Sequence, residues 1–180
     1  MLDEFRSARL QAVRLGWEHE EMVAAIHADE RVMASHRGVL SSEENHEWME
    51  SNIEQWERCG FGLWVFLGDN GELVGRGGLL AIDLFDSQEV ELNYSVAARC
   101  WRQGYATEMA TAALGLGFEY LPGASIIAFT RVENASSRGV MTKVGMTFER
   151  YFKLRGIAAV LYRLRRKKAE ASGLLNQRIS

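Results

Sequence analysis

The chain has 180 residues, of which 47% are hydrophobic and 25% are charged, and its formal net charge is -3 at pH 7. This length and apolar content suit one compact domain with a sizeable core. The slightly acidic charge argues against a general nucleic-acid-binding protein, for which a basic domain is expected.

The composition also argues against a membrane or secreted protein. No apolar run approaches the length of a membrane-spanning helix, and residues 1–6 lack the basic start and apolar core of an export signal. Cys59 and Cys100 are too few for a disulfide framework and lack zinc-like spacing. We therefore expect a cytoplasmic protein with no membrane partner, no metal site and reduced thiols.

Hydrophobic periodicity predicts the elements of the N-terminal half. These are a strand near residues 10–15, a helix around residues 22–26, a helix from about residue 42, and strands near residues 61–68, 72–82 and 88–97. Ser41 and Glu44 have the spacing of a capping box at the start of the second helix. Residues 69–71 are expected to form the hairpin turn between the second and third strands.

Hydrophobic periodicity also predicts the elements of the C-terminal half. The pattern predicts a central helix over 105–120, a short helix between Asn134 and Gly145, and strands near 125–131, 147–154 and 158–165. The basic segment 163–168 is consistent with a site for an acidic partner, or with a solvated end-strand and a frayed terminus.

A basic, glycine-containing loop joins the strand near 88–97 to the central helix. Arg102 and Gln103 precede Gly104, and the helix-forming segment follows at once. Backbone N–H groups at a helix start lack internal partners and the macrodipole is positive there, so this loop predicts a phosphate or diphosphate site. The spacing fits neither a P-loop nor a three-glycine dinucleotide fingerprint.

A second strand-to-helix turn lies thirty residues further on, where Asn134 is a favourable N-cap. Together, residues 101–108 and 134–138 resemble the coenzyme-A-binding segments of the GCN5-related N-acetyltransferase (GNAT) family, and in particular its RimJ/RimL-like branch, the ribosomal-protein N-terminal acetyltransferases. Segments 56–64, 71–75 and 161–164 strengthen the resemblance, which covers roughly residues 8–166.

The resemblance implies the fold and the cofactor. We expect a mixed α/β fold with a mostly antiparallel sheet of about seven strands and about four helices. A single N-acetyltransferase domain over 1–180 would have its core at 8–166 and a tail at 167–180. The cofactor implied is acetyl-coenzyme A, and the binding residues carried over are Val96, Arg102, Gln103, Gly104, Tyr105, Ala106, Thr107, Asn134 and Arg138. Arg138 could reach a phosphate, but an arginine on a helix surface is more often simply solvated.

The same resemblance implies two catalytic residues. Glu91 lies on the strand before the phosphate loop, where the family often places a base, and Glu89 lies on the same face. Two close, partly buried carboxylates raise the pKa of one of them, whereas two solvated glutamates would be ordinary strand residues. The family's usual acid, a tyrosine seven residues after Asn134, is Met141 here. Ser137 is then the candidate acid, although it could instead be a second capping residue. Water could also take the role of the acid, or the reaction could proceed without one.

We therefore predict acetyl transfer to a primary amine by direct attack in a ternary complex. The acceptor is a protein N-terminus or a small amine, and the protein is a monomer or a homodimer. Segments 35–38 and 153–156 are expected to wall the acceptor cleft, with Glu43, Glu44 and Glu47 either attracting a cationic amine or favouring their helix start. The alternative, motivated by Met141, is an acyl-coenzyme A sensor without turnover.

Overall fold

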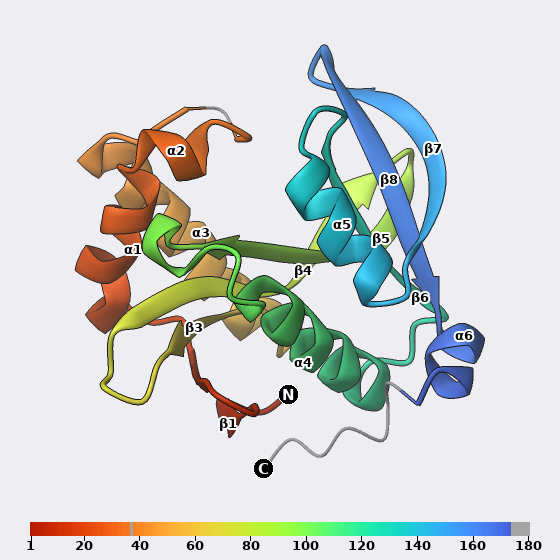
Figure 1. Cartoon of the computed structure of the whole chain (residues 1–180), viewed down its shortest axis with the longest axis horizontal. Helices are drawn as coiled ribbons and strands as arrows, with labels where there is room; N and C mark the ends of the chain where they lie inside the picture. The colour runs from red at the N-terminus through yellow and green to blue at the C-terminus, as the bar shows by residue number, and fades with distance from the viewer. Residues whose placement is uncertain (37, 174–180) are drawn as a thin grey trace.

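The computed structural model describes residues 1–36 and 38–173. Within them, eight strands form one sheet in the order β1-β2-β3-β4-β5-β6-β8-β7. Every neighbouring pair is antiparallel except β5 and β6, which are parallel. The predicted mixed α/β fold is confirmed, with eight strands and six α-helices in place of about seven and about four (Figure 1).

The N-terminal half contains five strands and three α-helices. Their bounds are β1 Glu4–Arg6, β2 Gln11–Arg14, α1 Glu20–His27, α2 Glu30–Met33, α3 Ser42–Cys59, β3 Leu63–Leu67, β4 Leu73–Leu84 and β5 Ser87–Val96. β1 is the strand that the sequence did not predict, and it lies outside the expected core of 8–166. Three residues are too few to show a period, but Phe5 is buried with its ring 5.2 Å from Trp64.

The C-terminal half contains three strands and three α-helices. Their bounds are α4 Tyr105–Tyr120, β6 Ser125–Arg131, α5 Ala135–Lys143, β7 Thr147–Leu154, β8 Ile157–Arg165 and α6 Arg166–Ala171. The end of segment 163–168, for which a frayed terminus was one alternative, is instead helical, since α6 begins directly after β8 and buries Ala169. Arg166 donates to the carbonyls of Phe118 and Leu121 at the end of α4, which holds α6 in place. Residues 174–180 of the expected tail lie outside the described residues.

The two faces of β4 are covered by different helices. α4 packs against the face that carries Leu79, where a Cβ added at Gly117 would lie 2.7 Å from the Leu79 side chain. α3 packs against the opposite face, since the Trp48 ring lies over Arg76. In Figure 1, α4 crosses in front of the sheet and α3 lies behind it.

Caps predicted from the sequence define the ends of the helices. Ser41 accepts a hydrogen bond from the Glu44 N–H, and the Glu44 carboxylate accepts from the Ser41 N–H, so the predicted capping box is confirmed. Gly145 follows α5 with a φ of 86°, as a left-handed helix terminus requires. Among the described residues, no helix combines the length and the apolar character needed to cross a membrane.

Candidate active site

A cavity of about 830 Å³ opens beside the second half of β5. Its wall combines the end of α2, the turn before α4, the start of α5 and the β7–β8 turn. It is lined from one face of β5 by Glu91, Asn93 and Ser95, and from the other face by Leu92, Tyr94 and Val96. Successive strand residues point to opposite faces, so the cavity reaches both sides of the sheet.

The cavity exists because β5 and β6 separate. Their described pairing is a single position, Glu91 with Ile127. The Ala97 N–H donates to the Val74 carbonyl at 2.9 Å, so Val96 belongs to a non-hydrogen-bonded pair with Gly75. The N–H and carbonyl of Val96 therefore point away from β4 and toward the cavity, where the carbonyl accepts from the Trp101 indole at 2.8 Å.

The loop before α4 forms the second part of the wall. Arg102 and Gly104 both have positive φ, 61° and 86°, which places the loop backbone in the left-handed region at two nearby points. The Glu108 N–H donates to the Gly104 carbonyl, so the first-turn N–H groups before Glu108 have no partner within the helix. The cavity-lining residues of this segment are Trp101, Arg102, Gly104, Tyr105, Ala106 and Thr107.

Two predicted cofactor residues lie off the cavity wall. The Gln103 side-chain amide donates to the Arg99 carbonyl at 3.1 Å. The Arg138 guanidinium donates to the Val132 carbonyl at 3.1 Å. Both side chains are bound to the backbone of their own segment, so we do not include them in the candidate site.

The start of α5 brings a serine and a tyrosine together. Asn134 caps the helix, with its Oδ1 accepting from the Ser137 N–H at 3.1 Å and its Nδ2 donating to Thr130. The Ser137 hydroxyl lies 2.9 Å from the Tyr94 hydroxyl, which also donates to the Ser137 carbonyl. Burial raises the pKa of Tyr94 to about 12, against a smaller opposing effect of the Ser137 hydrogen bond. Tyr94 therefore stays protonated at neutral pH and can donate a hydrogen bond.

Glu91 lies on the other face of β5 and is buried. It accepts a hydrogen bond from the Asn93 amide at 3.2 Å. Burial raises its pKa to about 7, and the Asn93 hydrogen bond and the charge of Arg76 oppose that rise. Both protonation states are therefore populated near neutral pH, as an efficient general base requires.

A chain of buried polar groups leads from Glu91 to α3. Arg76 donates to Asn93 Oδ1 at 2.6 Å and to His27 Nε2 at 3.3 Å. Burial, with the nearby Arg76 charge, lowers the pKa of His27 to about 4, so its ring is neutral and its Nδ1 donates to Asn45 at 2.8 Å. Burial lowers the pKa of Arg76 to about 10, which leaves the guanidinium charged at neutral pH.

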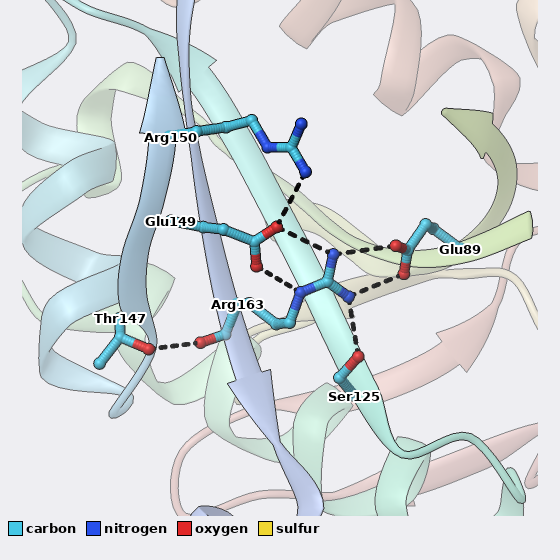
Figure 2. A network of polar contacts seen from close by, with 6 residues as sticks. All are labelled: Glu89, Ser125, Thr147, Glu149, Arg150 and Arg163. Atoms are coloured by element: carbon cyan, nitrogen blue, oxygen red, sulfur yellow. Dashed lines mark hydrogen bonds and ion pairs between the residues drawn. The ribbon is translucent and has the colours of Figure 1, made fainter. Parts of the chain in front are cut away.

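Glu89 has a different partner from the one that the sequence suggested. Figure 2 shows the Arg163 guanidinium between Glu89 and Glu149, with two nitrogen–oxygen distances of 2.9 Å to Glu89 and a further hydrogen bond to Ser125. The idea that Glu89 raises the pKa of Glu91 is therefore wrong, since burial is the main cause of that shift. The Arg163 network instead ties four strands together where β5 and β6 still pair.

His36 is the histidine on the cavity wall. Burial, together with the charges of Arg76 and Arg131, lowers its pKa to about 4, so the ring is neutral. In the part of the chain that the structure describes, no three His, Cys, Asp or Glu side chains gather as a metal site.

Comparison with known proteins decides the family. Residues 9–147 match the model of the acetyltransferase (GNAT) domain. The chain belongs to the GNAT acetyltransferase family. Its similarity to FsC-acetyl coenzyme A-N(2)-transacetylase of Aspergillus fumigatus is 33% identity over 152 residues, which cover 78% of this chain. The match spans 63% of the length of that relative.

Solved structures of this GNAT family share the fold. An acetyltransferase from Agrobacterium tumefaciens C58 gives a TM-score of 0.80 at 22% identity, covering 92% of this chain and 95% of that one. The ribosomal L7/L12 alpha-N-protein acetyltransferase RimL, solved with coenzyme A, gives a TM-score of 0.74 at 18% identity. The match covers 88% of this chain and 95% of that one. At these identities the likeness shows the fold alone, so the RimJ/RimL-like branch stays a prediction.

Several residues of this GNAT site were not predicted from the sequence. Tyr94 alternates with polar residues along its strand, as a core residue would, although its hydroxyl reaches α5. Arg76, a lone charge in an otherwise apolar strand segment, was a usable signal for a buried polar group. Asn93 and Arg131 carry no local signal, because only the tertiary fold brings them to Glu91 or to the cavity wall.

Proposed function

We propose that this protein transfers an acetyl group from acetyl-coenzyme A to a primary amine by direct attack in a ternary complex. The observation that carries the proposal is the cavity that reaches both faces of β5, with Glu91 toward one face and the turn before α4 toward the other. Such a cavity lets two ligands meet from opposite sides of the sheet, without a covalent enzyme intermediate.

The residues present fit the proposed cofactor. The unpaired first-turn N–H groups of α4 and the Arg102 side chain suit a diphosphate. The Val96 N–H is placed to bond an amide of the pantetheine arm, and Asn134 lines the same wall. When bound, acetyl-coenzyme A supplies an acetyl group activated as a thioester.

Glu91 is the proposed base and removes the proton that the acceptor nitrogen loses when it bonds to the acetyl carbon. The proposed acid is the pair formed by Ser137 and Tyr94. Ser137 donates its hydroxyl proton to the departing sulfur and takes a proton from Tyr94, 2.9 Å away. Tyr94 then recovers its proton from solvent as the products leave. This pair fulfils the role for which Met141 is unsuited, because a thioether carries no proton to donate.

The acceptor is proposed to be a small amine or a protein N-terminus. The Aspergillus relative, named for transfer to an N(2) position, supports a small-molecule amine. The structural likeness to RimL supports a protein N-terminus within a RimJ/RimL-like branch. Glu43, Glu44 and Glu47 are not on the cavity wall, and Glu44 is engaged with Ser41, so we do not propose that they attract the acceptor.

The test is thiol release from acetyl-coenzyme A with a panel of small amines and N-terminal peptides, alongside calorimetry of coenzyme A binding. We expect binding and amine-dependent thiol release. Tight binding without release across the panel would favour the sensor alternative, and the absence of binding would contradict the proposal.

A further inference from the structure

The acceptor side of the cavity carries an excess of positive charge. This side consists of the lining residues on the Glu91 face of β5, the end of α2, the same face of β6 and the β7–β8 turn. Its charged lining groups are three arginines, Arg31, Arg131 and Arg155, and one carboxylate, Glu91. The other charged lining residues lie outside this side: Arg102 in the turn before α4, Glu133 in the turn between β6 and α5, and Lys143 at the end of α5. Glu91 is itself buried and protonated for part of the time at neutral pH.

The three arginines differ in how well their charge is compensated. Arg31 forms an ion pair with Asp29 at 2.6 Å, so most of its charge is balanced locally. Among the ion pairs of the described residues, none includes Arg131 or Arg155. Arg131 donates to the His36 carbonyl, which fixes its guanidinium at the wall formed by the end of α2.

The residues behind the wall do not cancel this charge. Arg76 is buried and charged, and its described hydrogen bonds go to the neutral groups of Asn93 and His27. His36 is neutral, so it neither adds to nor offsets the field. An ammonium group that enters this region meets like charge, which favours its loss of a proton to give the nucleophilic amine.

A polyamine fits such a wall poorly, because its second ammonium group would remain charged beside the arginines. A carboxylate fits well, because the planar guanidinium of arginine binds two carboxylate oxygens at once. Building on the proposed acetyl transfer, we propose that the acceptor is an amine that carries a carboxylate a few bonds from the reacting nitrogen, and that Arg131 and Arg155 bind that carboxylate.

Three compounds of matched length test the proposal, namely 4-aminobutyrate, its neutral amide 4-aminobutanamide, and 1,4-diaminobutane. We expect kcat/KM to fall in that order, with about tenfold between the first two, as one charge-assisted hydrogen bond supplies. Peptides that begin with Asp, Asn or Lys form a second series, which distinguishes a protein N-terminus from a small amino acid as the source of the carboxylate.

Arg131→Gln and Arg155→Gln should each reduce the preference for the carboxylate compound, mainly through KM. Arg165→Gln is the matched control, because Arg165 is exposed on β8 and lies off the cavity wall. Equal rates for the three compounds, a preference for the diamine, or variants that keep the wild-type ratio would overturn the proposal.

Calorimetry of the same three compounds, titrated into protein saturated with coenzyme A, separates this inference from the proposed function. Carboxylate-selective binding without turnover would count against acetyl transfer and support the binding assignment. Turnover without carboxylate selectivity would support acetyl transfer and contradict the assignment of Arg131 and Arg155 as carboxylate-binding residues.

Discussion

Glu89 and Glu91 are the same residue type, two positions apart on one face of β5, yet their surroundings differ completely. Glu89 is bound by two nitrogen atoms of Arg163, both at 2.9 Å, in a network that spans four strands. Glu91 is buried and has one described hydrogen bond, from the neutral amide of Asn93. One glutamate therefore braces the sheet, and the other is available for proton transfer.

The difference shows that two identical side chains on one strand can have different roles, because their surroundings differ. A carboxylate bound by two nitrogen atoms of a guanidinium is held in a fixed structural contact. A carboxylate removed from water without a direct cation holds its proton more tightly, which explains the pKa of about 7 for Glu91. Asn93 keeps Arg76 close enough to influence Glu91 without forming an ion pair with it.

The largest expected effect comes from Glu91→Gln, which removes the proposed base and keeps its shape. We expect kcat to fall by about a hundredfold or more, while the affinity for coenzyme A changes little. Steady-state kinetics and calorimetry measure the two quantities. Glu89→Gln is the matched control, and an equal loss of kcat in both variants would contradict the division of roles.

Arg163→Met breaks the bracing network and leaves Glu89 and Glu149 facing each other. We expect the free energy of unfolding to fall by about 2 kcal/mol, because the site is only partly screened by water. Urea denaturation measures this loss. Arg150→Met is the control, since Arg150 reaches the same Glu149 from an exposed position at 3.6 Å and should cost less than about 0.5 kcal/mol.

Asn93→Asp places a second carboxylate between Arg76 and Glu91. In the wild type, activity should rise with pH through about 7, because Glu91 must lose its proton to act as a base. The variant should shift this rise upward by about one pH unit, since like charge disfavours ionisation of Glu91. The pH dependence of kcat/KM measures the shift, and an unchanged profile would show that Asn93 does not control the base.

The raised pKa of Glu91 also affects stability. Between its ordinary pKa of 4.5 and about 7, the folded protein binds a proton that the unfolded chain releases. The contribution of Glu91 to stability should therefore decline as the pH rises through this range. Urea denaturation at pH 5 and pH 8 should show a smaller decline in Glu91→Gln than in the wild type.

Tyr94→Phe gives the smallest expected effect, because a coenzyme A thiolate is already a good leaving group. Loss of one hydrogen bond worth about 1 kcal/mol predicts a kcat about fivefold lower. The KM for acetyl-coenzyme A should change little. A merely structural role for Tyr94 would instead lower stability and leave kcat of the folded fraction unchanged.

The sequence predicted the fold well wherever a pattern is local. The central helix over 105–120 coincides with α4, and the capping box at Ser41 forms as expected. The short strand β1 and the helix α6 escaped prediction, because they owe their existence to partners in β2 and at the end of α4. Arg37, in the segment expected to wall the acceptor cleft, lies outside the described residues.

In the candidate site, too, local features could be predicted from the sequence and contacts between distant segments could not. The turns at Gly104 and Asn134 depend on backbone geometry that neighbouring residues dictate, so the sequence alone located the proposed cofactor segments and the glutamate pair. The burial of Glu91 rather than Glu89 depends on strands and helices that are distant along the chain. The position of Tyr94 beside Ser137 depends on them too. Only the tertiary structure decided these points, because desolvation and charge pairing arise from the neighbours that folding brings together.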